Sequence, residues 1–260
     1  MLAYQPLDLL PVWGVYLLTV AVLMLSIEGG YRLGKVFQKR WPDHSESGVG
    51  VMVGASLAFL GFLLALIASI AVDIFNGRLE LVIMESNAIG TAYLRAGYLE
   101  EPISTESRQL LREYVDMRLA ALDRDQRDAA IARSEEIHQE LWSMAEIVAR
   151  NDPTDLTALY VASLNQVIDL HTERVKKELV IRVPPIFLLA IYLVAMFTML
   201  LMGVHDSYSD KLNYLALFLM VLILSMVFLV IVDLDRSHQG LITIPQNALM
   251  DLQRQIQSSP

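Results

Sequence analysis

The polar segment ESNAIGTAYLR, which runs from Glu85 to Arg95, carries side chains that could bind an anion. Asn87, Thr91 and Arg95 recur every four residues within it, and this spacing places them on one face of a helix. A guanidinium and an amide on one face can donate hydrogen bonds to an anion or to a carboxylate on a neighbouring helix. The interpretation that we favour is that they form hydrogen bonds between packed helices or subunits.

A second pattern, in the apolar stretch before Glu85, leaves one helical face with little side-chain bulk. Its small residues recur at intervals of four and three: Gly54, Ala58, Gly61, Ala65 and Ala68. Phe59 and Phe62 flank this face. In lipid, small residues at such spacing usually allow two helices to pack closely. The sharper hypothesis is that copies of this helix line a pore, with Phe59 or Phe62 as a hydrophobic constriction. The two roles can coexist on adjacent faces.

Two acidic residues lie at the end of the last apolar stretch, in the segment VDLDRSHQG. The carboxylates of Asp233 and Asp235 could contribute to a site for a hard cation, but such a site needs several more oxygen ligands. We therefore favour a helix end stabilised by an Asp–Arg pair that involves Arg236, and no metal is predicted. Glu28 lies one helical turn before Arg32, which predicts a salt bridge between them.

The sequence contains no pattern typical of an enzyme. It has no cysteine, and its five histidines are scattered without an HExxH pair. His138, which follows Glu135 on an expected helix, is interpreted as a residue of a solvated face. Phosphate-binding glycine loops and the GxSxG motif are also absent. We predict neither catalysis nor a cofactor.

Four stretches without Asp, Glu, Lys or Arg position these residues: 9–27, 47–72, 183–204 and 212–232. At a rise of about 1.5 Å per residue, each can cross a hydrocarbon core of roughly 30 Å as a helix. The lack of charge within them weighs against a proton-coupled transporter. We predict an all-α, polytopic membrane protein with four transmembrane helices and a helical extramembrane bundle between spans two and three.

The expected organisation has four parts. They are a transmembrane hairpin (1–73), a helical extramembrane region continuous with spans two and three (74–182), a second transmembrane hairpin (183–235) and a C-terminal tail (236–260). Span two has no strong breaker before Pro102, so its helix is expected to continue beyond the membrane. Ser104 or Thr105 is expected to cap the next helix, and a third begins near Asp125. Thr154 or Asp155 is expected to cap a fourth.

Charge limits the partners but leaves the orientation open. A net charge of −9 argues against nucleic acid, and the basic residues next to the spans are suited to anionic lipid headgroups of the bilayer. The first short loop, with Arg32, Lys35, Lys39 and Arg40, would be cytoplasmic by the positive-inside rule. The insertion, however, carries 13 of the 20 basic residues, and long domains count for less in that rule.

Several segments occur in an order that resembles the bestrophin-like family of bacterial membrane proteins. They are residues 54–66, ESNAIGTAYLR, Pro102, LLREYVDMRL, ALYVASLNQVID, RVP and DLDRSHQG. The resemblance covers nearly the whole chain, and ESNAIGTAYLR and DLDR are its most specific parts. It implies a bacterial inner-membrane protein. The family is distantly similar to true bestrophins, which are pentameric anion channels with four spans and a helical cytosolic portion.

By this resemblance, the chain would form a homo-oligomer, a pentamer, that passes small inorganic ions, with span two lining the pore. Phe59 and Phe62 would form its neck, and the termini and the insertion would be cytoplasmic. True bestrophins also have a long acidic calcium clasp after the last span, and this sequence has only Asp233 and Asp235 there. The leading hypothesis is a homo-oligomeric channel for small anions. The alternative is a non-conducting membrane scaffold or sensor whose helical insertion binds a partner.

Overall fold

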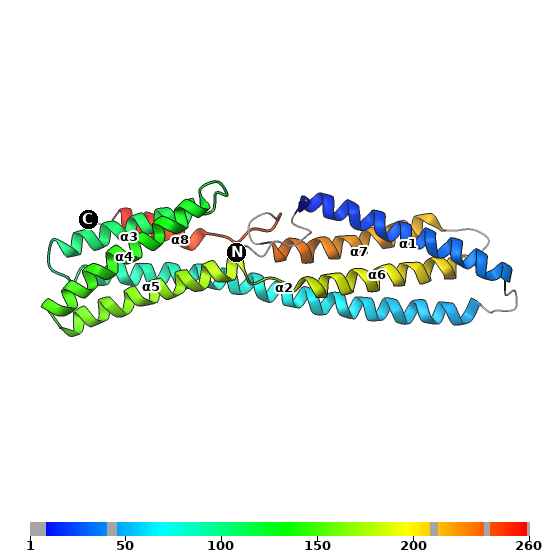
Figure 1. The fold of residues 1–260 in the computed structure, drawn as a ribbon, viewed down its shortest axis with the longest axis horizontal. Helices are drawn as coiled ribbons and strands as arrows, with labels where there is room; N and C mark the ends of the chain where they lie inside the picture. Colours follow the sequence, from blue (N-terminus) through cyan, green and yellow to red (C-terminus); the bar gives the residue numbers. More distant parts are fainter. Residues whose placement is uncertain (1–8, 41–45, 209–212, 237–239, 259–260) are drawn as a thin grey trace. The chain divides into compact units, whose positions relative to one another are not determined.

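The computed structural model describes residues 9–40, 46–208, 213–236 and 240–258. Within these ranges it is 86% helical, with eight helices and no strand, so the all-α prediction is confirmed. The helices are α1 (Val12–Arg40), α2 (Glu46–Ala96), α3 (Ile103–Ala120), α4 (Arg127–Asn151), α5 (Asp155–Leu179), α6 (Pro185–Asp206), α7 (Tyr214–Asp235) and α8 (Asn247–Gln257) (Figure 1). Parts of the first hairpin, of the second hairpin with the start of span four, and of the tail lie outside the described residues: 1–8, 41–45, 209–212, 237–239 and 259–260.

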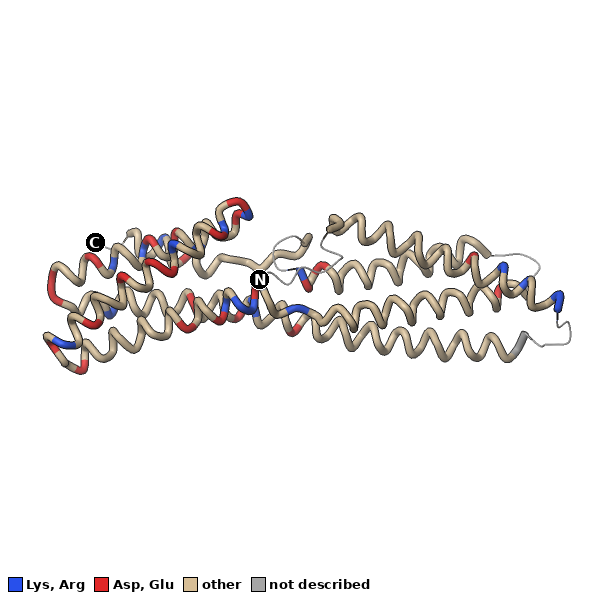
Figure 2. Tube along the Cα trace, viewed as in Figure 1, with Lys and Arg blue, Asp and Glu red and all other residues tan. Residues whose placement is uncertain are grey.

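The chain divides into two compact units, which we call the apolar unit (residues 1–75 and 181–243) and the polar unit (76–180 and 244–260). Four helices are long and apolar enough to cross a membrane: α1, α2, α6 and α7. Lys, Arg, Asp and Glu are sparse along the helices of the apolar unit and frequent in the polar unit (Figure 2). Helix α2 contributes residues to both units as one continuous helix, as predicted, and it ends at Ala96.

Local sequence explains several helix ends. Thr154 has an extended backbone before α5, and its hydroxyl oxygen accepts the N–H of Thr157 at 3.3 Å, as expected for an N-cap. Asn213 caps α7 in the same way through the N–H of Ala216. Helix α6 begins at Pro185, where proline lacks only an N–H that would have no partner within the helix. The predicted cap of α3 at Ser104 or Thr105 is wrong, since that helix already begins at Ile103.

Close packing in the apolar unit occurs between α1 and α6. A Cβ atom built on Gly30 would collide with the carbonyl oxygen of Leu200, and one on Gly203 would collide with that of Ile27. Gly34, one turn after Gly30, faces Ser207 in the same contact. Small residues four apart therefore bring two helix backbones together here, as is common in membranes. Elsewhere in this contact, the hydroxyl groups of Thr19 and Tyr192 lie 2.7 Å apart.

The apolar unit has one core, to which all four of its long helices contribute. Its buried members include Leu23 of α1, Leu60 of α2, Met199 of α6 and Phe228 of α7. At the surface, Glu28 pairs with Arg32 at 2.7 Å, so the predicted salt bridge is confirmed.

The polar unit buries a core of its own between α2, α3, α4 and α5: Ile89, Leu111, Val115, Ile137, Leu141, Leu164 and Val167. The C-terminal region predicted as a tail contains α8, which buries Leu249, Leu252 and Ile256. Ser86 of α2 donates to the carbonyl oxygen of Ala248 at 2.9 Å, and Gln253 donates to Asp116 of α3 at 2.6 Å. The end of the chain is therefore an integral part of this unit.

Two neighbouring glycines test the α1–α6 contact. We expect Gly30→Ala to destabilise the protein by about 1–3 kcal/mol, because its Cβ would meet backbone that cannot rotate away. Gly29→Ala is the matched control, since a Cβ there meets nothing within 4 Å. The control should be neutral or slightly stabilising, because Ala favours helix over Gly by about 1 kcal/mol. Thermal unfolding in detergent measures both, and equal losses would show that the close approach does not matter.

Candidate functional site

The face of α2 predicted to line a pore is exposed in the single chain. Phe59 and Phe62 have exposed fractions of 55% and 64%, and the small candidates on this face are exposed as well: Gly54, Ala58, Gly61 and Ala65. A Cβ atom built on Gly54 or Gly61 would meet nothing within 4 Å. The close packing that small residues allow is therefore not used on this face within one chain. The neighbour of this face of α2 is therefore lipid, a pore or a second copy of the chain.

The polar segment after span two has a different role, because its side chains join α2 to other helices of the polar unit. Arg95 donates to the carbonyl oxygen of Leu159 on α5 at 2.9 Å, and Tyr93 donates to that of Ile256 on α8 at 3.3 Å. Leu252 of α8 approaches Gly90 so closely that an added Cβ would lie 3.3 Å from its Cδ1. The hydroxyl group of Thr91 donates to the carbonyl oxygen of Asn87 in its own helix at 2.9 Å, and Asn87 itself is exposed.

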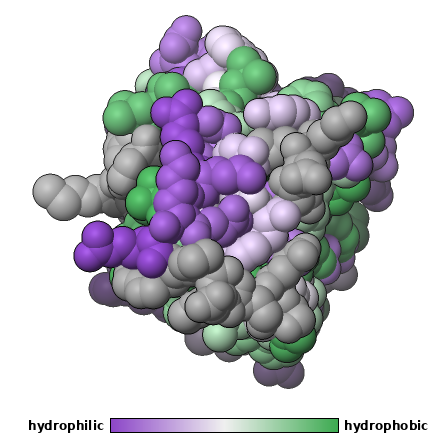
Figure 3. All heavy atoms as spheres, turned by 90° about the vertical axis from the view of Figure 1, so that its right-hand side faces the viewer, coloured by the Kyte–Doolittle hydropathy of each residue, from purple (hydrophilic) through white to green (hydrophobic). Residues whose placement is uncertain are grey.

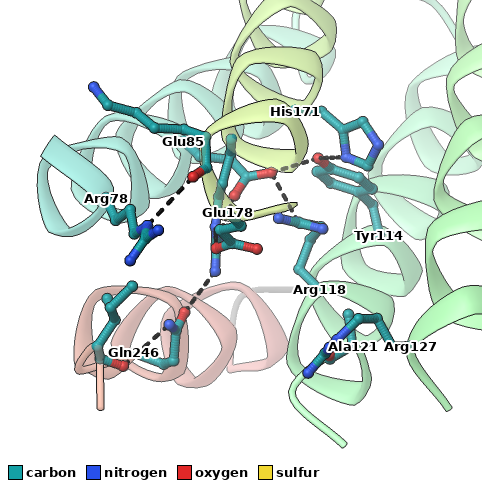
Figure 4. A network of polar contacts seen from close by, with 12 residues as sticks. Arg78, Glu85, Tyr114, Arg118, Ala121, Arg127, His171, Glu178 and Gln246 are labelled. Atoms are coloured by element: carbon teal, nitrogen blue, oxygen red, sulfur yellow. Dashed lines mark hydrogen bonds and ion pairs between the residues drawn. The ribbon is translucent and has the colours of Figure 1, made fainter. Parts of the chain in front are cut away.

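Glu85 is the centre of this arrangement, and its side chain has an exposed fraction of 0%. Arg118 of α3 lies 2.9 Å from its Oε1, and Arg174 of α5 lies 2.5 Å from its Oε2. The hydroxyl group of Tyr114, also on α3, donates to Oε1 at 2.6 Å. Figure 4 shows Tyr114 and Arg118 directed towards the Glu85 carboxylate. Two guanidinium groups thus compensate a charge that would be very costly to bury alone.

Arg174 extends this centre to the C-terminal region. Its Nη2 donates to the Gln246 side-chain oxygen at 2.8 Å, just before α8, and its Nε pairs with Glu178 at 2.7 Å. Burial alone would lower the pKa of Arg174, but the carboxylates of Glu85 and Glu178 outweigh it and raise the pKa. Burial, and then the charge of Glu85, raises the pKa of Tyr114. The hydroxyl group of Tyr114 therefore stays protonated and can donate to Glu85.

Two buried histidines lie against Tyr114. Its hydroxyl oxygen lies 3.0 Å from His171 Nδ1, and because the hydroxyl hydrogen points to Glu85, Nδ1 must carry a proton and donate. His171 Nε2 is then unprotonated, and it is buried without a hydrogen-bond partner. The ring of His138 lies 4.7 Å from that of Tyr114 and 4.8 Å from that of His171.

The prediction that His138 belongs to a solvated face is wrong, because its exposed fraction is 6%. Burial lowers the pKa of His138 to about 4 and that of His171 to about 3, and Arg118 adds to both effects. Both imidazoles are neutral at pH 7. His171 shares one face of α5 with Leu164 and Ile168, a spacing that indicates burial, but the sequence does not reveal its contact with α3 and α4.

The acidic residues at the end of α7 organise the backbone around them. Asp233 accepts the N–H groups of Leu241 and Ile242 at 2.7 and 2.8 Å. Asp235 accepts the N–H of Val183 at 2.7 Å and pairs with Arg182 at 2.7 Å. Arg236 is buried and follows the helix as its C-cap. An Asp–Arg pair at this end of α7 thus joins Asp235 to Arg182.

Polar residues also gather at one end of the apolar unit, where α1 ends. Figure 3 shows hydrophilic side chains on this end and apolar ones around it. The exposed basic residues Arg32, Lys39 and Arg40 belong to the last turns of α1. Within the part of the chain that the structure describes, no group of three or more His, Cys, Asp or Glu could hold a metal ion.

This architecture is that of an all-helical, multi-pass membrane protein. A model of the bestrophin-like domain matches residues 20–249, and the chain belongs to the bestrophin-like family. A bestrophin homologue from Klebsiella pneumoniae has a similar structure, with a TM-score of 0.62 and 14% identity over 93% of this chain and 96% of that chain. A single-residue variant of that homologue gives 0.58 and 14% over 95% and 99%. At this identity the likeness shows the fold alone. No curated protein matches the chain.

Removal of the buried charge tests the Glu85 centre. We expect Glu85→Gln to lower the free energy of unfolding by about 3–5 kcal/mol, because it removes the carboxylate that faces buried Arg118 and one of the two carboxylates that face Arg174. Glu113→Gln is the control, since Glu113 pairs with Arg133 at 2.7 Å on the surface and its loss should cost less than about 1 kcal/mol. Thermal unfolding of both variants in detergent gives the comparison. Similar losses would contradict a special role for Glu85.

The neutral histidines predict a pH dependence. Their pKa values in the folded protein lie below the ordinary value of 6.5, so the unfolded chain binds more protons as the pH falls. The stability is fully present above pH 6.5 and decreases below it. For His138 alone the loss between pH 6.5 and 5 is about 2 kcal/mol. His138→Asn, which cannot take up that proton, should show a shallower loss between pH 7 and 5. An unchanged slope would contradict the assignment.

Proposed function

We propose that several copies of this chain form an ion channel whose pore is lined by α2. The observation that carries the proposal is the exposed face of α2, where glycines have open space in front of them and Phe59 and Phe62 project outward. Membership of the bestrophin-like family and the similar fold of the Klebsiella pneumoniae homologue support it. True bestrophins are pentameric anion channels, so a pentamer in a bacterial inner membrane is the assembly that we propose.

In this assembly the small residues let neighbouring copies of α2 approach each other, and the phenylalanines narrow the path. A ring of aromatic side chains without charge can close a pore to ions when water leaves it. The four spans contain no Asp, Glu, Lys, Arg or His, which weighs against proton-coupled transport and is compatible with such hydrophobic gating. We place the polar unit and both termini in the cytoplasm, by analogy with true bestrophins.

Two classes of permeant ion are candidates for this channel. The resemblance to true bestrophins favours small anions. A cation channel is the second candidate, because the exposed charged residues of α2 just beyond residue 72 are Asp73 and Glu80, whereas Arg78 is buried. Rings of carboxylates select cations and rings of guanidinium or ammonium groups select anions. Chloride flux would support the first candidate and potassium flux the second.

Flux through the purified protein in liposomes tests the pore. We expect Phe59→Ala and Phe62→Ala to raise the flux about tenfold or more, since a barrier lowered by about 1.4 kcal/mol has that effect. Phe197→Ala is the matched control, because Phe197 of α6 has an exposed fraction of 62% but lies outside the proposed pore. Equal flux in the wild-type protein and in all three variants would show that Phe59 and Phe62 do not form the neck of a pore.

The native mass in detergent is the companion measurement. A pore lined by one helix per copy requires several copies of the 29.2 kDa chain, and five are expected. A monomer would exclude the pore. It would instead favour a scaffold or sensor whose polar unit binds another protein.

A further inference from the structure

The last part of α1 extends beyond the stretch that can cross the membrane. All charged residues of this helix lie between Glu28 and Arg40, whereas the residues from Val12 to Ile27 carry no charge. With 29 residues and a rise of about 1.5 Å per residue, α1 is roughly 43 Å long, and the hydrocarbon core of a bilayer is roughly 30 Å thick. The segment 28–40 therefore reaches into the layer of the lipid headgroups.

One side of this segment is held against α6. Gly30, Gly34 and Gln38 recur every four residues, so they share one helical face. Ser207 of α6 lies against Gly34, and its hydroxyl oxygen accepts a hydrogen bond from Gln38 Nε2 at 2.8 Å. An added Cβ atom on Gly30 would collide with the backbone of α6. These contacts fix the rotation of the segment about its own axis, so its opposite side is presented in one orientation.

The opposite side combines cations with exposed apolar side chains. Arg32, Val36 and Arg40 also recur every four residues, and they are displaced by two positions, or about 200°, from the face that packs on α6. Leu33 and Lys39 lie next to them, three residues before and after Val36. Val36 and Leu33 have exposed fractions of 64% and 47%, and the three basic residues are exposed as well (Figure 3). A helical face of this composition is typical of a helix at the interface between lipid and water.

Two of these cations have no counter-charge in the protein. Arg32 pairs with Glu28 at 2.7 Å, but Lys39 and Arg40 form no ion pair within the part of the chain that the structure describes. Asp206 of α6 also lies at this end, and its Oδ2 is buried. Cations in the last turn interact favourably with the helix dipole. The dipole alone, however, gives no reason for exposed apolar side chains beside them, so a ligand has to account for both features.

We propose that this side of α1 binds the headgroup of an anionic phospholipid. Leu33 and Val36 precede Lys39 and Arg40 along the helix, so they lie nearer the hydrocarbon core. The lipid phosphate would accept charge-assisted hydrogen bonds from Lys39 and Arg40, while the first part of the acyl chains covers Val36 and Leu33. A soluble phosphate would leave the apolar side chains uncovered, and a zwitterionic headgroup would bring its own ammonium group near the two cations. The proposal does not depend on whether the protein conducts ions.

Lipid binding to the purified full-length protein in a neutral detergent tests this site. Phosphatidylglycerol and phosphatidylethanolamine with identical acyl chains are titrated separately, and native mass spectrometry counts the bound lipids. We expect the dissociation constant of phosphatidylglycerol to be lower by about tenfold or more, because its headgroup carries a net negative charge that the other lipid lacks. Inorganic phosphate at about 10 mM and constant ionic strength should not displace phosphatidylglycerol, since it gains nothing from the apolar side chains.

Two variants locate the lipid. Replacing Lys39 and Arg40 together by Gln should weaken the binding of phosphatidylglycerol by about tenfold or more, because each exposed cation near an anionic lipid adds attraction. Val36→Glu should have a similar effect, since it places a carboxylate between the cations at an exposed position. The matched control is the double variant Arg124→Gln and Arg150→Gln, which removes two exposed cations from the polar unit and should leave lipid binding unchanged.

Three results would overturn the proposal. The first is equal affinity for the two lipids, which would show that the headgroup charge is not recognised. The second is displacement of phosphatidylglycerol by inorganic phosphate, which would make this a site for a soluble anion. The third is a loss of affinity in the polar-unit control as large as in the Lys39 and Arg40 variant, because the total charge of the protein and not this side of α1 would then attract the lipid.

Discussion

A carboxylate that is ionised in the interior of a protein must be compensated where it lies, and this constraint organises the polar unit. Glu85 is fully buried and receives Arg118, Arg174 and Tyr114. These partners come from α3 and α5, and Arg174 also holds Gln246 just before α8. If any of these helices moved away, buried charges would lose their partners. The ion-pair centre therefore fixes several helices by one electrostatic requirement.

Helix α2 combines two kinds of surface along its length. Between residues 76 and 96, it buries a charge and forms hydrogen bonds to α5 and α8. Before residue 75, it contributes one side to the core of the apolar unit and leaves the small-residue side open. The two regions of α2 thus differ in what they contact: the region in the polar unit forms polar contacts with other helices, and the region in the apolar unit leaves one face open in the single chain.

The similar structures share only about one residue in seven with this chain, at 14% identity, yet they cover nearly all of it. A fold can persist at this identity because long apolar helices tolerate exchange among Leu, Ile, Val and Phe when patterning and volume are kept. Features that depend on the position of single atoms tolerate fewer substitutions. In this chain they include the glycine contact between α1 and α6 and the carboxylate of Glu85.

The sequence alone determined the helical class, four apolar helices, the continuity of α2 and a cap at Thr154 or Asp155, because these depend on local composition and on neighbours a few residues apart. It also marked ESNAIGTAYLR as unusual. The partners of Glu85 were partly signalled, since Tyr114 and Arg118 lie one turn apart in LLREYVDMRL and His171 lies on an apolar stripe with Arg174 one turn later. Polar residues on a buried stripe need partners, but a single sequence does not say which.

Only the tertiary structure decided those pairings. It showed that His138 is buried, that α8 belongs to the polar unit, and that Asp235 pairs with Arg182. Within one chain, it also located close helix packing at Gly30 and Gly203 and left the small residues of α2 exposed. The physical reason is the same in each case. Helical periodicity says which residues share a face, whereas contacts between residues far apart in the chain depend on how whole helices pack.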